Sequence, residues 1–187
     1  MKKVISVMVA MLMAATMSLN AAQRGKFIHL DNTVNKDLKP RLAFCQDHQD
    51  GEDITTLLLW TVKQNTYHEF TDAARILIRF SDNSMVRLAR TKTSEDKKEK
   101  FTKKNGTATI AYCKTITSYE VTPEVIEKLE AGLTIVKVRI VFMENEAKDY
   151  DIAEGYQARL AADLLKSYQE ASGKNRKANA DLSDEDF

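Results

Sequence analysis

The 187-residue sequence contains few of the residues from which catalytic sites are built, with only three histidines, two cysteines and six glycines. No G-x-S-x-G motif is present, and His29, His48 and His68 lie outside any recognisable catalytic context, so a serine-nucleophile triad is not indicated. The glycines stand far apart, which excludes a glycine-rich loop that cradles phosphate. Acidic residues are numerous, but nothing in the sequence pairs two of them across a cleft as a glycosidase requires. The sequence therefore predicts no catalytic residue.

The sequence gives only weak indications of a metal site. Cys45 and His48 have C-x-x-H spacing and acidic neighbours, but a closed zinc site needs four ligands, usually from two such pairs, and Cys113 stands alone. His48 also occupies a position at which a calcium-binding loop needs an acidic or amide side chain. We interpret the acidic residues 47–53 as a solvated turn, and we predict neither a metal nor a cofactor.

The first twenty-two residues have the pattern of a bacterial secretory signal peptide. Lys2 and Lys3 form a short basic start, residues 4–17 are almost wholly apolar, and small residues then lead to cleavage after Ala21 or Ala22. The alternative is an uncleaved N-terminal anchor, but the apolar run is shorter than the roughly 20 residues that a membrane span needs. No cysteine follows the run, so a lipid anchor is not expected. The expected product is periplasmic or secreted, without stable membrane insertion.

Removal of this leader leaves 26 basic and 27 acidic side chains, a net charge of −1. A nearly neutral protein has no general attraction for nucleic acid or anionic lipid, so nucleic acid is not an expected partner. The remaining length suits one domain with a real hydrophobic core, which we place at residues 23–172. Residues 173–187 are charged and non-periodic, and are expected to form a disordered tail.

Cys45 and Cys113 allow one disulfide bond, because an exported protein meets oxidising conditions. Such a bond would close a long loop and stabilise the fold by about 4 kcal/mol in the chain-entropy model. The alternative is two separate buried thiols, since free cysteine packs as a small hydrophobic side chain. Neither residue has a sequence context that would lower its pKa, so a nucleophilic cysteine is not expected.

Alternating apolar residues predict a strand-rich domain. We expect strands at residues 41–46, 54–63, 107–121 and 135–142, and a hairpin at residues 75–90. The apolar run at 54–63 is also compatible with a helix, because short apolar runs are ambiguous. Residues 91–104 hold almost no core residue and are predicted to be a long, exposed basic loop that ends in a turn at Asn105 and Gly106.

Two helices are predicted in the last third of the chain. Thr122 and Pro123 begin a short helix that Gly132 ends, and Asp151 is expected to cap an amphipathic helix that runs to about Ala171. The predicted fold class is α+β: a mostly antiparallel β-sheet or sandwich, with the short helix and the C-terminal amphipathic helix packed on it.

Basic side chains recur on the polar faces of the hairpin and of the strand at 135–142. They predict a basic surface stripe formed by Arg75, Arg79, Arg87, Lys137 and Arg139. The alternative is ordinary placement of positive charge at exposed strand positions.

Four segments carry a resemblance to known proteins: R-I-L-I-R-F-S-D-N-S-M-V-R-L, Y-E-V-T-P-E-V-I-E-K-L, I-V-K-V-R-I and L-L-K-S-Y. In apolar spacing they resemble small exported proteins of unknown function from Gram-negative gut bacteria. The resemblance implies a β-rich domain with helical additions, and it assigns neither an activity nor a functional residue.

The sequence thus favours an exported, non-catalytic module that binds another protein or an envelope component. The alternative is a small-ligand-binding or hydrolytic periplasmic protein, with a site between helix and sheet built from Trp60, Tyr112, Tyr119 and nearby acids. A deep apolar pocket with convergent polar groups would favour this alternative, and an exposed patch would favour the interaction module. The partner and the oligomeric state do not follow from the sequence.

Overall fold

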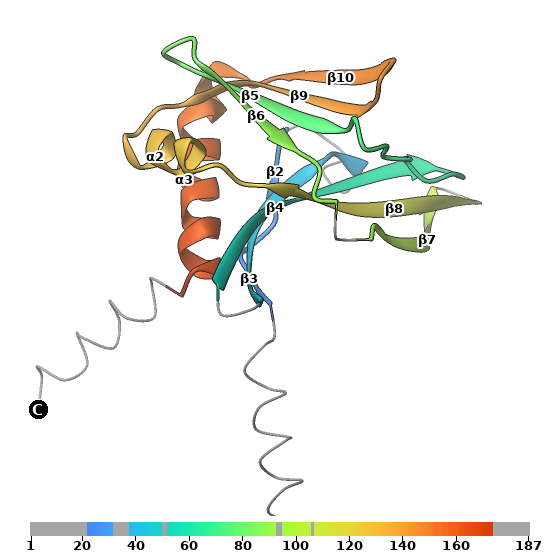
Figure 1. The fold of residues 1–187 in the computed structure, drawn as a ribbon. Coiled ribbons are helices and arrows are strands. Elements are labelled where there is room, and N and C mark those ends of the chain that lie inside the picture. Colours follow the sequence, from blue (N-terminus) through green and yellow to red (C-terminus); the bar gives the residue numbers. More distant parts are fainter. Residues whose placement is uncertain (1–21, 32–37, 50–51, 93–94, 106, 174–187) are drawn as a thin grey trace, which may run out of the picture.

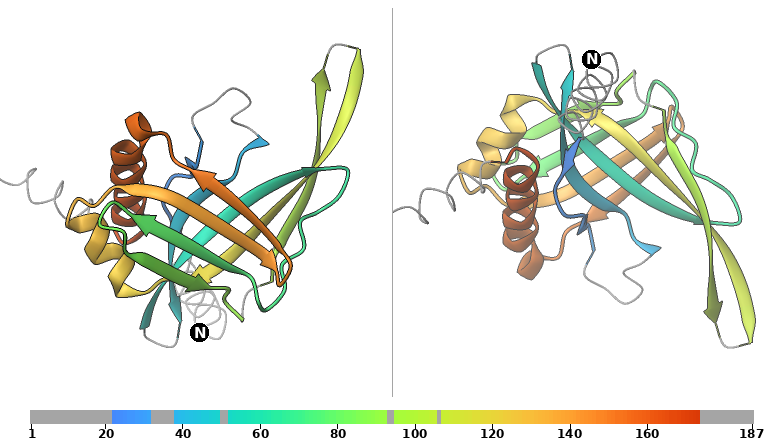
Figure 2. Two further views of the ribbon diagram at one scale, coloured as in Figure 1. Left: turned by 90° about the horizontal axis from the view of Figure 1, so that it is seen from above. Right: turned by 90° about the horizontal axis from the view of Figure 1, so that it is seen from below.

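The computed structural model describes residues 22–31, 38–49, 52–92, 95–105 and 107–173 (Figure 1). The predicted signal peptide lies outside these residues except for Ala22, and the predicted tail lies outside them except for Gly173. Two antiparallel sheets pack face to face, and two helices lie at one end of both sheets (Figures 1 and 2). The predicted α+β class with a C-terminal helix is confirmed.

The first sheet, sheet A, has the order β1-β3-β4-β8-β7, with β2 also paired to β3. The second, sheet B, has the order β10-β9-β5-β6. In chain order the elements are β1 (Gln23–Arg24), β2 (Ile28–His29), β3 (Arg41–Gln49), β4 (Glu52–Gln64), β5 (Arg75–Phe80), β6 (Met85–Ala89), β7 (Lys97–Asn105), β8 (Ala108–Glu120), α2 (Pro123–Glu130), β9 (Ile135–Met143), β10 (Glu146–Asp151) and α3 (Glu154–Ala171).

The hydrophobic core lies between the two sheets and under α3, because each strand turns alternate side chains inward. Leu57 and Leu59 of β4 and Ile76 and Ile78 of β5 belong to this core, and all four are buried. From the helix side the core is closed by Val125, Leu129, Leu160, Ala161, Leu164 and Ala171. Helix α3 contacts β3 of sheet A and β9 of sheet B, so it joins the two layers. Among the described residues, no helix combines the length and the apolarity needed to span a bilayer.

The loop predicted at residues 91–104 is a strand from Lys97 onward, because β7 (Lys97–Asn105) pairs along its whole length with β8. The prediction was wrong since β7 is an edge strand, and edge strands tolerate a row of lysines that a central strand would exclude. The turn was predicted at Asn105 and Gly106; Asn105 is instead the last residue of β7 and pairs with Ala108 of β8, and Gly106 lies outside the described residues.

Three smaller predictions also need correction. The turn predicted at residues 47–53 is shorter, since β3 continues to Gln49 and pairs there with Glu52 of β4. The strand β10 was not predicted. Asp151 belongs to β10 instead of capping α3, whose N-cap residue is Ala153.

The N-terminal segment is fastened between β3 and α3. The Gly25 amide donates to the Phe44 carbonyl at 2.9 Å. The Ser167 hydroxyl of α3 accepts from the Phe44 amide at 3.1 Å and donates to the Lys26 carbonyl at 3.0 Å. A Cβ atom at Gly25 would collide with the Ser167 backbone carbonyl, so only glycine allows this close approach. These contacts fix β1 beside β3, at the border of the site described next.

Candidate functional site

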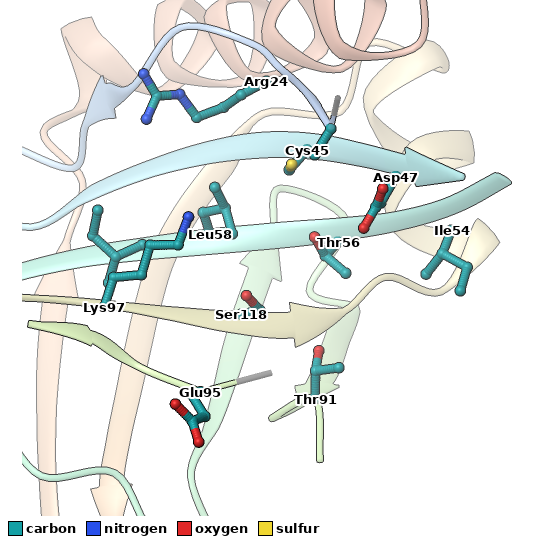
Figure 3. Close-up of a pocket in the computed structure, with 12 residues that line it drawn as sticks. Arg24, Cys45, Asp47, Ile54, Thr56, Leu58, Thr91, Glu95, Lys97 and Ser118 are labelled. Carbon is teal, nitrogen blue, oxygen red and sulfur yellow. The ribbon is translucent and has the colours of Figure 1, made fainter. Parts of the chain in front are cut away.

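A groove of about 560 Å³ lies on the outer face of sheet A, the face turned away from sheet B (Figure 3). Its floor is formed by side chains that alternate with the core residues of the same strands. Thr56 and Leu58 come from β4, Ile116 and Ser118 from β8, and Cys45 from β3. The register explains their proximity, since Leu58 is directly opposite Ser118 and Cys45 is directly opposite Thr56. The floor therefore mixes apolar side chains with short hydroxyl groups.

Charged side chains of both signs stand around this floor. Arg24 and Lys97 lie toward one end of the groove, Asp47 and Ile54 lie toward the other, and Glu95 borders the β8 side (Figure 3). Ile54 is 40% exposed, which is unusual for a large apolar side chain on a sheet. The groove is consequently polarised along its length, with cations at one end and an acid at the other.

The wall that carries Glu95 and Lys97 is held by the residue between them. The Asp96 carboxylate accepts a hydrogen bond from the Thr117 hydroxyl at 2.8 Å and from the Arg90 guanidinium at 3.2 Å. Arg90 also forms an isolated β-bridge with Tyr119, so this corner joins β8 to the chain that leaves sheet B. The polar contacts keep the segment after β6 against sheet A and present its charges to the groove.

An aromatic and cationic cluster, the Trp60 cluster, adjoins the cationic end of the groove. It consists of Phe27, Arg41, Trp60 and Lys114. The Arg41 guanidinium lies 3.7 Å from the centroid of the Trp60 ring, and the Lys114 ammonium lies 5.3 Å from it. Phe27 packs edge-on against Trp60, with centroids 5.5 Å apart. The Lys114 ammonium is also ion-paired with the Glu99 carboxylate, so the cluster packs cations on an aromatic face at this end of sheet A with part of their charge compensated.

No protein-family model, curated protein or solved structure matches this chain. The resemblance to small exported proteins from Gram-negative gut bacteria therefore stays a prediction.

The two cysteines are free and do not form the disulfide considered from the sequence. Cys45 is opposite Thr56 of β4, and Cys113 is opposite Lys63 of the same strand. Seven residues of strand separate these positions by about 23 Å, far beyond the reach of a disulfide. An odd separation also places the two side chains on opposite faces of the sheet. The second interpretation, two separate thiols, describes the structure.

The Cys45 thiol at the groove is not an activated nucleophile. Burial raises its pKa, and the Asp47 carboxylate raises it further, while Arg24 and Lys97 act in the opposite direction. The thiol is thus held in its protonated form near neutral pH, and the thiolate is the reactive species.

The histidines do not assemble a site among the described residues. His68 stacks on Phe142 with ring centroids 4.5 Å apart, and burial lowers its pKa, so the ring is neutral and packed against the core. His29 lies in β2, and the side chain of His48 is outside the described part of the structure. No group of three or more histidine, cysteine or acidic side chains in the described ranges is arranged to bind a metal.

The alternative site considered from the sequence, between helix and sheet with Trp60, Tyr112 and Tyr119, is not formed in the structure. Trp60 and Tyr112 belong to the outer face of sheet A, whereas Tyr119 is fully buried on the inner face. Burial raises the pKa of Tyr119 well above its usual range, with a further contribution from Asp96. Tyr119 differs from the other two rings in strand parity, which places it on the opposite face of the sheet.

The five residues of the predicted basic stripe share the outer face of sheet B. The register places Leu77 between Arg87 and Arg139, and Arg79 between Met85 and Lys137. The stripe is nevertheless partly neutralised. Lys137 lies 2.9 Å from the Asp149 carboxylate, and Arg139 donates to the same group through two nitrogens.

These ion pairs hold the pKa of Asp149 down at about 2, chiefly through the hydrogen bonds from Arg139. Arg75 donates to the Ala73 carbonyl at 3.1 Å. In the described part of the chain, Arg79 and Arg87 form no ion pair and are exposed. The acidic partners were missed because β10 was not predicted.

Sequence reasoning also missed the groove itself. Arg24 is far in sequence from Glu95 and Lys97, and the latter two were assigned to the predicted loop at residues 91–104. The available signal was the alternation of Thr56, Leu58 and Trp60 on one face of β4, which already indicated that this face is not purely polar.

Proposed function

We propose that this protein is an exported binding module, without catalytic activity of its own, that holds an extended segment of a partner protein in the sheet A groove. The observation that carries the proposal is a sheet face that no described element of the chain covers and that bears an apolar-floored groove with opposite charges at its ends. Such a surface offers shape and charge complementarity to a peptide, and its side chains do not supply a nucleophile with an adjacent base.

The charges around the groove indicate the occupant. A segment with an acidic residue at one end would lie near Arg24 and Lys97, and a basic residue at the other end would lie near Asp47. Apolar side chains between them would contact Leu58 and Ile116. A volume of about 560 Å³ is within the range of ligand-binding clefts, and it suits a few residues of extended chain.

Export is supported by the leader pattern in the sequence, and it places the partner in the bacterial envelope or outside the cell. An envelope protein with an exposed, mixed-charge segment is the kind of partner that this groove fits. The neutral overall charge of the mature chain agrees with recognition through a local site rather than through a general field.

The proposal can be tested by selecting binders from a displayed peptide library and measuring their affinity by fluorescence anisotropy. We expect the selected peptides to share an acid, an apolar centre and a base. Leu58→Glu places a charge on the groove floor and should weaken binding at least tenfold. Met85→Glu is the matched control, because Met85 is 60% exposed on sheet B and should leave affinity unchanged.

A second variant, Ser118→Trp, fills the floor without adding charge and keeps a residue type that strands accept. If Leu58→Glu lost binding because it misfolded, Ser118→Trp would still test whether the groove floor is needed for binding. Equal affinity of the wild type, Leu58→Glu and Ser118→Trp would contradict the proposal, as would selected peptides without a common charge pattern.

A further inference from the structure

The β7–β8 hairpin extends beyond the body of the protein. Strand β4 ends at Gln64, opposite Tyr112 of β8, which in turn pairs with Phe101 of β7. Beyond this point residues 102–105 pair only with residues 108–111, apart from one hydrogen bond from the Asn65 amide to the Ala111 carbonyl. Figure 2 shows the two strands projecting away from the rest of the molecule. We call residues 97–105 and 107–116 the β7–β8 arm.

Positive charge surrounds this arm. Strand β7 carries five lysines in nine residues, Lys97, Lys98, Lys100, Lys103 and Lys104. Its single acid, Glu99, is ion-paired with Lys114 of β8. Because side chains alternate, Lys97 and Lys103 belong to one face of the ribbon, and Lys98, Lys100 and Lys104 belong to the other. The whole chain is nearly neutral, so this is a strong local concentration of cations.

Protection of an edge strand explains only part of this pattern. Charged side chains, lysine in particular, protect edge strands from pairing with another chain. Here lysines continue to Lys104, past the point where the arm is the edge of a larger sheet. Lys98 and Lys100 are also directed at one aromatic ring, with their ammonium groups 5.7 and 6.0 Å from the centroid of Tyr67. A structural role alone does not require this density of charge.

We propose that the β7–β8 arm docks the protein electrostatically onto a membrane surface that contains anionic phospholipid. Lysines within reach of such a surface each contribute favourably to binding. Lys98, Lys100 and Lys104 share one face of the ribbon, and that face can lie along a flat surface. Among the described residues near the end of the arm, Ile110 is the one large apolar side chain and the others are polar or small, so the arm binds lipid headgroups and does not insert.

An anionic membrane fits the arm better than a nucleic acid does. Phe101 and Tyr112 stack on one another with centroids 5.6 Å apart, rather than standing apart as platforms for successive bases. Lys98, Lys100 and Lys104 are exposed along an edge strand and do not line the sheet A groove, so they offer no channel that a nucleic acid strand could follow. Docking on lipid does not depend on peptide binding in the sheet A groove. The lysines near the end of the arm, Lys103 and Lys104, do not line that groove.

The test compares three full-length proteins that share the same N-terminus. They are the wild type, an arm variant with Lys98→Gln, Lys100→Gln and Lys104→Gln, and a control with Arg79→Gln, Arg87→Gln and Lys148→Gln. The two variants lose the same charge, and the control residues are exposed on sheet B. Each protein is sedimented with vesicles of phosphatidylcholine alone and of phosphatidylcholine mixed with phosphatidylglycerol, at low and high salt.

The wild type and the control should bind the mixed vesicles, bind phosphatidylcholine vesicles far less, and be released by high salt. The arm variant should bind about a hundredfold more weakly, on the basis of roughly tenfold or less per lysine. Equal binding to both vesicle types, equal binding of all three proteins, or equal loss in the control would overturn the proposal. The proposal would also be overturned if the protein bound an oligonucleotide through these lysines but did not bind the vesicles.

Discussion

The outer faces of the two sheets carry similar numbers of charges but use them differently. On sheet B, Lys137 and Arg139 are paired with the carboxylates of the neighbouring strand β10. On sheet A, Arg24 and Lys97 border a groove, and neither forms an ion pair within the described ranges. Paired charges on a solvated sheet mainly compensate one another, whereas charges held apart around an apolar floor remain available to a ligand.

The two faces also differ in how the chain builds them. Sheet B consists of two hairpins, β5–β6 and β9–β10, so each charge meets its partner within a short stretch of sequence. The groove in sheet A requires the N-terminal segment, three strands and the segment before β7 to come together. Its shape therefore depends on long-range packing, in particular on α3, and it should be the more fragile of the two faces.

The largest expected effect is that of Gly25→Ala on the free energy of unfolding, and it acts on the sheet A side of the molecule. The added methyl group collides with the Ser167 backbone carbonyl, and we expect a loss of about 2–3 kcal/mol in the free energy of unfolding, as for other overpacked sites. Urea denaturation gives this value. Gly155→Ala in α3 is the control, because no atom lies within 4 Å of its added Cβ and alanine favours the helix. A Gly25→Ala protein as stable as Gly155→Ala would show that α3 does not fix the wall of the groove.

Asp149→Asn should act on sheet B and leave the groove unchanged. The pKa of Asp149 is lowered to about 2, so its ion pairs stabilise the fold at pH values above the ordinary carboxyl pKa of about 4. That contribution is lost as the pH falls from about 4 through about 2. Because exposed pairs are screened, we expect the substitution to cost about 1 kcal/mol or less at neutral pH and to flatten the acid limb of the stability curve.

Denaturation of both proteins at pH 7 and at low pH measures the difference. Asp151→Asn provides the control, since the Asp151 side chain is 82% exposed and should contribute less. An unchanged acid limb in Asp149→Asn, or a larger effect of Asp151→Asn, would be incompatible with the proposed role of the β10 carboxylates.

The sequence predicts much of this fold because most strands alternate strongly. The hairpin β5–β6, the strands β3, β4, β8 and β9, and both helices all lie where apolar spacing places them. Lysine-rich β7 and acidic β10 were missed, since edge strands lack an apolar face of their own. Ile135 also departs from simple alternation. A register shift beside Phe80 of β5 places it in the core, whereas strict alternation would put it on the face of Lys137.

The candidate site was less predictable than the fold for a physical reason. Alternation shows that Leu58 and Trp60 share a face, but it does not show which strand lies beside β4. The neighbours of the groove floor are set by pairing between segments that are distant in sequence, such as Arg24 with Cys45. Local patterns carry little information about such pairing, so charges assigned to loops could not be placed around a groove.

The smallest expected effect concerns Cys45, whose reactivity reports the electrostatic field in the groove. Asp47→Asn removes a carboxylate that raises the thiol pKa, so the reaction with Ellman's reagent at pH 8 should become a few times faster. Arg24→Gln removes a cation that lowers the pKa and should slow the reaction. Cys113 is buried and should react only after unfolding, which then reveals two free thiols without reduction. Equal rates in the wild type and both variants would mean that the charges around the groove do not act on its floor, and sheet A would then resemble sheet B in having its charges neutralised.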